Sequence, residues 1–596
     1  MEGPGYIDNG TASGQGTPLN GYRAWTPGYT FQELNQQLVN RFIGGSNVNW
    51  RPTSWMQNRA NVGIDYGARQ DINLLLRNQG PPINANYRKG FKDDNRTSIR
   101  NFSVDLGSTN TWQFRPTITS KTTVGAQYVA YELSQVDAYA EDLPVGTQTV
   151  SAGAVPSAGE STTLQNTLGL FIDEAVSFRD RLFVTAAVRT DQNSAFGTNF
   201  QRVFYPKASV SWLMSQESFF PDLPGMDEFR LRAAYGASGT QPGSNDALRS
   251  FSPTVANLKG TDTPGVLFST LGNANLKPER ATEFETGFDA KFLGGRMTAD
   301  VTYYNKLTKD ALISAIVPPS LGAASSVRSN LGSVKNDGWE FQLFSQLLER
   351  RRLGIDLSLS ASANSNELVS LGGLPPQVGT TTRAETGYPL FGFWAQPITG
   401  WNDKNHDGIL TYNADPALNE VFLGDSTIFR GYHTPRYTVT AQAGFDLLNR
   451  RLRITAMGDY RGGNLWYNNT ERIRCVSRQN CNGLMNPDAS FQEQAMVVAT
   501  RDNPGRTLDG FFQPGWFYKL REVSVTYALP ENIAAKIFRS RSASINFAGR
   551  NLAKFTKYRG VDPETDRDAR ASSDTPDEFQ TLANPSYFIL RFSVGY

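Results

Sequence analysis

Residues 436–447 read Arg-Tyr-Thr-Val-Thr-Ala-Gln-Ala-Gly-Phe-Asp-Leu. From Val439 to Leu447, every second side chain is apolar, and all but one of the intervening side chains are polar. Successive side chains of a strand point to opposite faces, so this stretch predicts a strand with one apolar and one polar face. The same period recurs in segments of roughly ten residues, which is the length that a tilted strand needs to cross a bilayer. The sequence therefore predicts a membrane β-barrel.

About eighteen segments show this alternation of apolar and polar residues, and none of them shows the 3.6-residue period of a helix. They predict an all-β, antiparallel fold. We expect the strands near residues 46–55, 57–68, 97–108, 122–140, 165–179, 181–195, 203–215, 229–239, 281–293, 296–311, 336–348, 353–367, 391–402, 435–448, 451–465, 516–529, 542–554 and 587–596. A barrel of this size encloses a lumen.

The connections between these segments come in two sizes. Tight turns near 179–181, 293–296 and 449–451 alternate with long stretches rich in Gly, Pro, Ser, Thr and Asn, the longest of them near 240–280 and 466–514. In outer-membrane barrels short turns face the periplasm and long loops face outside. The alternation predicts the same orientation here.

Composition agrees with a barrel. The 596 residues are 39% hydrophobic and 19% charged with a net charge of +2, so nothing suggests a nucleic-acid partner. No run of eighteen apolar residues is present, which excludes a helical membrane protein. Barrel strands remain compatible with the low mean hydropathy, because every second residue of such a strand is polar. The first residues, Met-Glu-Gly-Pro-Gly, lack the features of a secretory signal. We therefore expect either that leading residues have been removed or that the chain begins partway through a longer gene product.

Cys475 and Cys481 are the two cysteines of the chain and lie in a polar segment. A bridge between them would close a short loop in an oxidising compartment and stabilise it by a few kcal/mol at most. Two free thiols are the alternative. Zinc is not expected, because no histidine lies near enough to complete a ligand set.

One segment carries the spacing of a calcium loop. Asp403, Asn405 and Asp407 supply oxygens at positions one, three and five, a glycine follows at position six, and the carbonyl of Ile409 and the hydroxyl of Thr411 fall at positions seven and nine. Position twelve is an alanine rather than an acid. A metal-free turn built from Asx side chains is the alternative.

Catalytic signatures are scarce, and we do not expect an enzyme. The chain has two histidines, no G-x-S-x-G elbow and no phosphate loop. Acidic side chains on the polar strand face, among them Glu283, Glu285, Asp289 and Asp300, suit the wall of a water-filled lumen better than a glycosidase pair.

Aromatic side chains near strand ends predict girdles at the lipid headgroups. This set comprises Trp50, Trp55, Tyr303, Trp394, Trp466 and Tyr467. For aromatics in the long loops, such as Trp401, Phe511, Phe512 and Trp516, stacking on a sugar ring is the alternative role.

Several motifs resemble the TonB-dependent transporters of the SusC/RagA type. They are Asn-Leu-Lys-Pro-Glu at 275–279, Asn-Leu-Gly-Ser-Val-Lys-Asn-Asp-Gly-Trp-Glu at 330–340, Tyr-Lys-Leu-Arg-Glu-Val-Ser-Val-Thr-Tyr-Ala-Leu-Pro at 518–530, and Asn-Leu-Ala-Lys-Phe-Thr-Lys-Tyr-Arg-Gly-Val-Asp-Pro-Glu at 551–564. The match runs across most of residues 46–596. The last strand, which ends on Tyr596, resembles the assembly signal of outer-membrane proteins.

The resemblance implies an integral barrel of the outer membrane with about 22 strands, an amino-terminal plug, a SusD-like surface lipoprotein as partner and energy from TonB. We expect residues 1–45 to be irregular with a partial strand and residues 46–596 to be the barrel, with the plug, the TonB-contacting segment and roughly four strands absent. The predicted function is import of an oligosaccharide or a peptide. A passive porin-like channel and a secreted carbohydrate-binding β-sandwich are the alternatives.

Overall fold

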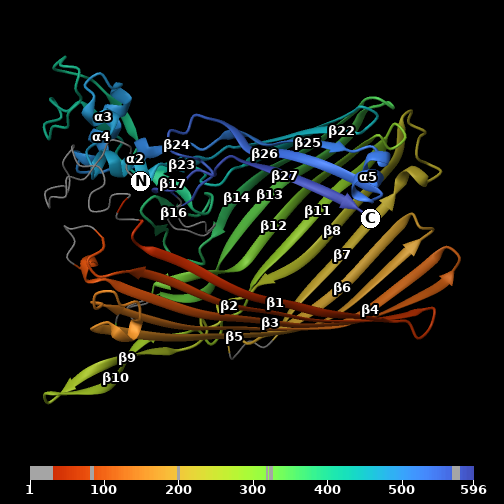
Figure 1. Cartoon of the computed structure of the whole chain (residues 1–596), viewed down its shortest axis with the longest axis horizontal. Coiled ribbons are helices and arrows are strands. Elements are labelled where there is room, and N and C mark those ends of the chain that lie inside the picture. Colours follow the sequence, from red (N-terminus) through yellow and green to blue (C-terminus); the bar gives the residue numbers. More distant parts are fainter. Residues whose placement is uncertain are drawn as a thin grey trace.

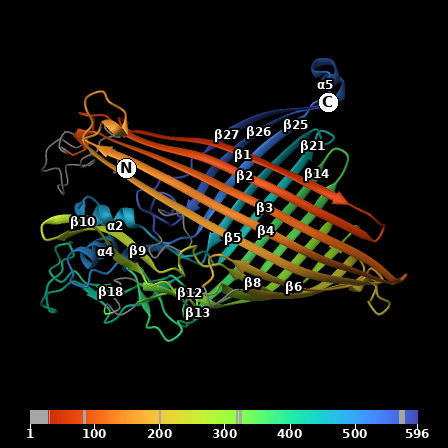
Figure 2. The same ribbon diagram turned by 90° about the horizontal axis from the view of Figure 1, so that it is seen from below.

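A computed structural model describes residues 31–80, 86–197, 202–316, 326–566 and 577–596, together with residues 28 and 320. Most of the expected irregular segment 1–45 therefore lies outside the described residues, and its irregular character stays a prediction. The described part is dominated by one large curved sheet (Figures 1 and 2), whose inner face we call the luminal wall.

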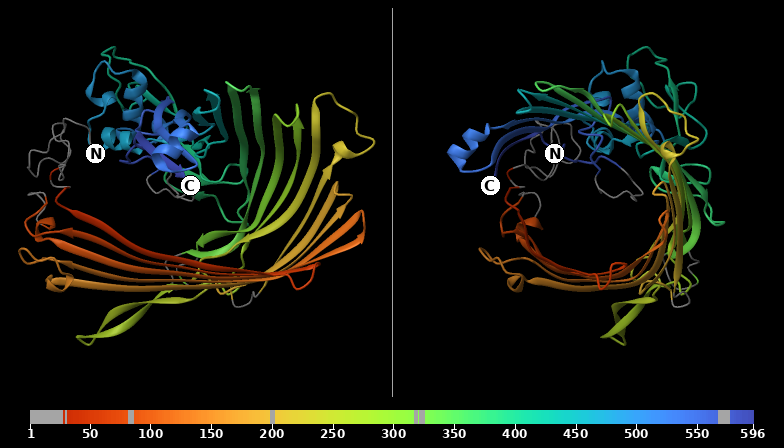
Figure 3. Two further views of the ribbon diagram at one scale, coloured as in Figure 1. Left: turned by 45° about the vertical axis from the view of Figure 1, so that its right-hand side comes forward. Right: turned by 90° about the vertical axis from the view of Figure 1, so that its right-hand side faces the viewer.

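This sheet contains seventeen strands, each paired antiparallel with its neighbours. Its members are β1 (Leu34–Trp50), β2 (Met56–Leu75), β3 (Phe91–Arg115), β4 (Ile118–Glu141), β5 (Val155–Phe178), β6 (Leu182–Asn193), β7 (Val203–Leu213), β8 (Met226–Thr240), β11 (Glu279–Phe292), β12 (Met297–Ile316), β13 (Ser326–Glu349), β14 (Gly354–Ser370), β21 (Tyr437–Leu447), β22 (Leu452–Gly462), β25 (Phe517–Ala528), β26 (Ser542–Thr556) and β27 (Tyr587–Gly595). They follow one another in chain order. Within the described residues β1 and β27 are not paired with each other, and they flank the opening visible in Figure 3.

Strand register places the apolar positions on one face. In successive strands Phe288 is level with Val301, Val301 with Phe341, Phe341 with Ala361, and Ala361 with Val439. Directly paired residues share a face of a sheet, so these five form one apolar row. The two-faced pattern read from 436–447 is confirmed across neighbouring strands.

All but one of the predicted strands belong to this sheet. The exception is 391–402, which forms part of small sheets outside the barrel wall and buries Phe393, Trp394 and Ala395 there, because a period of two does not distinguish lipid contact from packing against loops. These short strands are β15 (Gln377–Val378), β16 (Thr382–Ala384), β17 (Gly392–Ala395), β18 (Ile398–Trp401), β19 (Val421–Leu423), β20 (Ile428–Gly431), β23 (Leu465–Tyr467) and β24 (Phe512–Pro514). The first barrel strand also begins at Leu34 rather than at 46.

The connections alternate between two ends of the sheet, as predicted. The short-turn end carries connections such as 116–117 and 448–451, whereas the long-loop end carries 371–436, 463–516 and 557–586. One long connection contains a hairpin that the sequence did not reveal, β9 (Ser250–Leu258) paired with β10 (Thr261–Thr270), which projects from the barrel in Figure 1.

The long-loop end also holds short helices, which the sequence did not reveal, and the all-β fold class is unaffected by them. They are α2 (Asn469–Val476), α3 (Asn482–Met485) and α4 (Phe491–Arg501), with α5 (Glu531–Phe538) at the short-turn end and single 3-10 turns at Tyr87–Lys89, Val150–Ala152, Met214–Gln216 and Asp509–Phe511. Ser490 caps α4 by accepting a hydrogen bond from the Glu493 N–H. In the described part of the chain, no helix combines the length and apolarity of a membrane span.

Candidate functional site

The luminal wall is polar and its charges are largely paired with one another. Arg232 on β8 reaches Asp300 on β12 with Nη2 to Oδ2 at 2.6 Å and Asp289 on β11 with Nε to Oδ1 at 3.1 Å. Lys306 lies 3.5 Å from Glu283. Three of the predicted carboxylates, Glu283, Asp289 and Asp300, therefore lie on the wall and are paired with cations.

A hollow of about 600 Å³ opens on the same wall between β3 and β8. Its lining includes Asp105, Phe171, Asp173, Arg189, Tyr205 and Lys207. Two charge pairs lie in it: Lys207 Nζ on β7 is 3.1 Å from Asp173 on β5, and Arg189 Nε is 2.7 Å from Asp191 on the same strand, β6. The hollow therefore combines aromatic and aliphatic side chains with paired charged groups, so its lining offers a ligand both apolar contacts and hydrogen-bonding groups.

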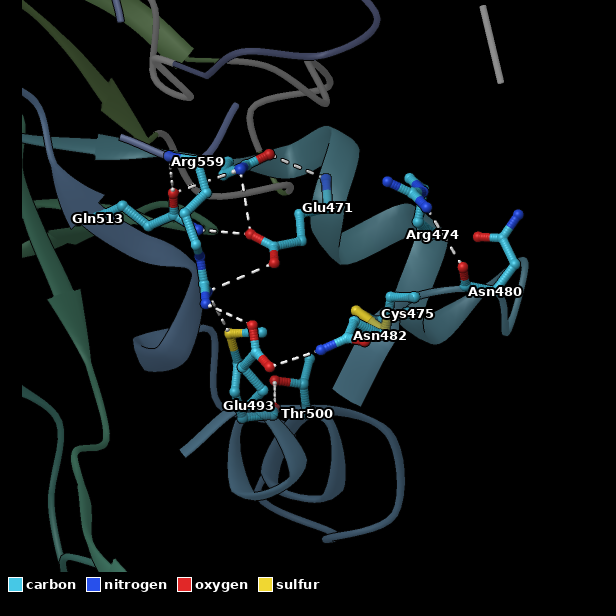
Figure 4. The surroundings of a disulfide bond; sticks show 12 residues. Glu471, Arg474, Cys475, Asn480, Asn482, Glu493, Thr500, Gln513 and Arg559 are labelled. Atoms are coloured by element: carbon cyan, nitrogen blue, oxygen red, sulfur yellow. Dashed lines mark hydrogen bonds and ion pairs between the residues drawn. A yellow bond between two sulfur atoms is a disulfide. The ribbon is translucent and has the colours of Figure 1, made fainter. Parts of the chain in front are cut away.

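Three long connections fold into one unit at the long-loop end, which we call the loop unit (residues 371–436, 463–516 and 557–566). Its core contains Phe393 from the first connection and Tyr467, Met496, Val497 and Phe511 from the second, all buried. The third connection joins through Arg559, which reaches Glu471 of α2 at 3.4 Å and Glu493 of α4 at 3.2 Å (Figure 4).

The two cysteines are bridged, which resolves the alternatives left open by the sequence. Cys475 and Cys481 are buried in the core of the loop unit, where the bridge ties α2 to the start of α3. A covalent link inside a folded core matches an oxidising compartment.

The third connection is fastened to the barrel wall by a buried ionic cluster. Lys519 of β25 lies with Nζ 2.8 Å from Asp562 and 2.6 Å from Glu564, and the side chains of Lys519 and Asp562 are each only 5% exposed. Arg521 reaches Glu564 at 2.6 Å and Asp459 of β22 at 2.6 Å. We call these five side chains the clamp.

The clamp is expected to release in acid. Burial by itself raises the pKa of Glu564, but hydrogen bonds from Arg521 and Lys519 and their charges outweigh burial and lower the pKa to about 2. A carboxyl whose pKa is depressed on folding stabilises the fold above its unfolded pKa of about 4.3 and loses this effect as the pH falls towards 2. Hydrogen exchange of 557–566 should therefore be constant from pH 7 to about pH 5 after correction for intrinsic rates, and accelerate below about pH 4. Unchanged protection at pH 2 would contradict this.

The predicted calcium loop lies in the first connection of the loop unit. Asp403 Oδ2 accepts a hydrogen bond from the Gly408 N–H at 3.0 Å, and Asp407 Oδ1 accepts one from the Ile409 N–H at 2.8 Å. Asn405 is hydrogen-bonded to Asp407 at 2.8 Å. The other carboxylate oxygen of Asp403 is buried and accepts no hydrogen bond. Across the described ranges, no three His, Cys, Asp or Glu side chains converge as a metal-binding group.

Glu420 organises this loop and was missed by sequence reasoning, because it lies well beyond the expected position twelve. Its side chain is buried, and one oxygen accepts from the Lys404 N–H at 3.0 Å while the other accepts from Thr411 N–H at 2.8 Å and Oγ1 at 2.9 Å. Thr411 thus contacts Glu420 rather than standing free as a ligand.

Replacing Glu420 by alanine should loosen the loop. The substitution leaves the backbone donors of residues 404 and 411 without their acceptor. These residues are not buried, so each lost hydrogen bond costs about 0.5–1.5 kcal/mol. We expect proteolysis within 403–420 to accelerate while heat-modified migration of the barrel on gels is unchanged. Asp425→Ala, which alters an acidic side chain outside these contacts, is the control; equal protease resistance of the two variants would refute the assignment.

The aromatic prediction is partly wrong. Trp394, Trp466 and Tyr467 are buried inside the loop unit, because aromatic rings in this chain serve loop packing as well as membrane anchoring. Phe511 is also fully buried, which removes it as a sugar-stacking surface. Trp50 is exposed at the end of β1, as expected for a girdle residue.

Comparison with known proteins identifies the family to which this chain belongs. The sequence profile of the family described as "TonB dependent receptor-like, beta-barrel" matches residues 3–460, which is most of the chain. The chain belongs to this family. Among its relatives are TonB-dependent receptor P26 of Formosa agariphila, 24% identical over 65% of this chain and 41% of that protein, and TonB-dependent receptor SusC of Bacteroides thetaiotaomicron, 28% identical over 33% of this chain and 20% of that protein.

The solved structure titled "Structure of the RagAB peptide transporter" has the same fold, with a TM-score of 0.79 and 19% identity over 95% of this chain and 62% of that one. The predicted SusC/RagA-type resemblance is thereby confirmed. Measured against the Formosa receptors, this TonB-dependent receptor chain spans between 41% and 54% of their length.

Proposed function

We propose that this TonB-dependent receptor chain is the barrel portion of an outer-membrane transporter that imports a bulky nutrient, an oligosaccharide or a peptide. A SusD-like lipoprotein would present the nutrient at the long-loop end, which faces outside, and TonB would supply energy through a part of the protein beyond this chain. The observation that carries the proposal is the seventeen-stranded antiparallel sheet with an apolar outer row and a polar, charge-paired inner wall.

Uptake in the native bacterium tests this proposal. Labelled oligosaccharides and peptides are offered to cells that carry the intact gene, a deletion of it, or the intact gene without TonB. Import should require both the gene and TonB. Import that persists without TonB would favour the passive channel, and a protein that stays soluble without detergent would favour the β-sandwich.

We also propose that the 403–411 loop binds calcium through Asp403, Asn405, Asp407 and the carbonyl of Ile409. The support is the free, buried oxygen of Asp403, positioned as in loops whose first residue ligates the ion. Its purpose would be to rigidify the rim of the loop unit.

Calcium titration of the purified chain provides the test. Added calcium should raise the temperature at which 403–420 becomes protease-sensitive, and Asp403→Asn should abolish this shift because it removes a charged ligand. Magnesium, which prefers a stricter octahedral geometry, should act weakly. A heat of binding indistinguishable between wild type and Asp403→Asn would rule the site out.

A further inference from the structure

Strand β5 is longer than the neighbour that follows it. β5 runs from Val155 to Phe178, whereas β6 ends at Asn193, which is level with Thr167. Residues 155–166 therefore have β4 on one side and, in the part of the chain that the structure describes, no strand on the other. The result is a step in the wall at the long-loop end, separate from the outermost strands β1 and β27.

Hydrogen bonding at the foot of this step shows which backbone groups are free. The Asn166 N–H donates to Ser194 Oγ at 3.0 Å, and the Asn166 carbonyl accepts from the Ser194 N–H at 3.0 Å. The N–H and C=O of Asn166 thus point away from β4. Along an antiparallel strand, the N–H and C=O of successive residues point alternately to one neighbouring strand and to the other. The β4–β5 register has no shift from 155 to 178, so this alternation holds throughout β5.

Every second residue from Asn166 towards the start of β5 has the same backbone orientation as Asn166. Backbone groups face the open side at Pro156, Ala158, Glu160, Thr162 and Leu164. Proline has no N–H, so this edge offers four donors and five acceptors. The edge is also solvent-accessible, since residues 155–162 are exposed without exception and Leu164 is 61% exposed.

Charge decides what kind of chain fits this edge. The free stretch, 156–164, carries one charged side chain, Glu160, at its centre, and none of the lysines that commonly protect exposed edges. Two copies pairing along the whole stretch would be centred on Glu160 and would set two carboxylates directly opposite each other, which is unfavourable. A different strand with a basic side chain at that point meets no such repulsion.

We propose that residues 156–164 of β5 bind an extended segment of a second protein by strand addition, with a lysine or arginine of that segment opposite Glu160. The added strand continues the line of β6 at the rim of the barrel. This interaction surface goes beyond the import function and does not depend on it.

Residue-resolved hydrogen exchange of the purified chain in detergent tests this site. The probe is a blocked synthetic peptide of about nine residues, threonine alternating with valine around a central lysine, which spans the free stretch at ~3.4 Å per residue. Exchange at Ala158, Glu160, Thr162 and Leu164 should slow at least about tenfold with saturating peptide, whereas the amides between them, bonded to β4, should be slow throughout. Exchange at these four amides that stays fast at millimolar peptide would overturn the proposal.

Two matched variants identify the contacts. Thr162→Pro removes a donor on the open side without removing a bond to β4, and should weaken peptide binding about tenfold; Thr162→Val keeps the donor and should bind as wild type. Glu160→Lys should transfer the preference to a peptide with a central glutamate. Equal peptide binding by the two Thr162 variants would refute the proposed site. Concentration-dependent dimerisation that Thr162→Pro abolishes would refute the proposed partner, because it would identify a second copy of this chain as the occupant.

Discussion

Replacing Lys519 by methionine should release the third connection of the loop unit from the barrel wall. Lys519 is the nearest cation to Asp562, and both side chains are almost fully buried. Removing one member of a buried ion pair leaves an uncompensated charge and typically costs about 3–5 kcal/mol. Residues 557–566 should lose most of their protection against hydrogen exchange, while the strands of the sheet keep theirs.

Two further variants separate charge from packing. Lys519→Met combined with Asp562→Asn removes both charges of this pair and should restore a large part of the protection, because the remaining carboxylate near methionine, Glu564, keeps Arg521 as its partner. Lys536→Met, at an exposed lysine of α5, should behave as wild type. If the single and double variants at the clamp lose protection equally, the ionic explanation fails.

Phe393→Ala should unfold the loop unit while leaving the barrel sheet intact. The ring is fully buried, stacks on Phe512 with centroids 4.7 Å apart, and lies in the cluster that contains the disulfide. Truncating a buried phenylalanine to alanine costs about 3–5 kcal/mol, because a cavity replaces the ring. Phe393 comes from connection 371–436, whereas the other buried members of the cluster come from connection 463–516. Its loss should therefore separate these two connections.

Limited proteolysis combined with gel mobility provides the measurement. Cleavage within 371–436 and 463–516 should rise at least tenfold, while the heat-modifiable migration that reports a folded barrel persists. Phe491→Ala, a truncation of a more exposed phenylalanine at the start of α4, is the matched control. Loss of barrel migration in Phe393→Ala would mean that the loop unit and the sheet fold as one cooperative body.

The sequence predicted the sheet far better than the loop unit. Strands such as β11 and β12 alternate with few exceptions, because one face meets lipid and the other meets water, so their pattern is visible in the sequence of each strand alone. The segment 391–402 alternates too, yet Phe393 and Trp394 face other loops, and only tertiary contacts distinguish these environments.

The site shows the same contrast. The spacing of Asp403, Asn405 and Asp407 is local and was readable, whereas Glu420 acts on them across a loop whose return path no motif encodes. Lys519 and Asp562 are likewise distant in the chain and adjacent only in the fold. Helices α2 and α4 were overlooked because they are short and polar or buried on most sides, which weakens a 3.6-residue period.

The unequal strand lengths shape the mouth of the barrel. At ~3.3 Å per residue and a tilt of ~45°, β3 to β5 with 24 or 25 residues rise about 55 Å along the axis, whereas β21 and β22 with 11 residues rise about 25 Å, roughly the hydrocarbon thickness. On the side of β3 to β5, the sheet therefore extends far above the bilayer. On the opposite side, β21 and β22 end close to the bilayer surface, and helices and loops extend the protein outward instead.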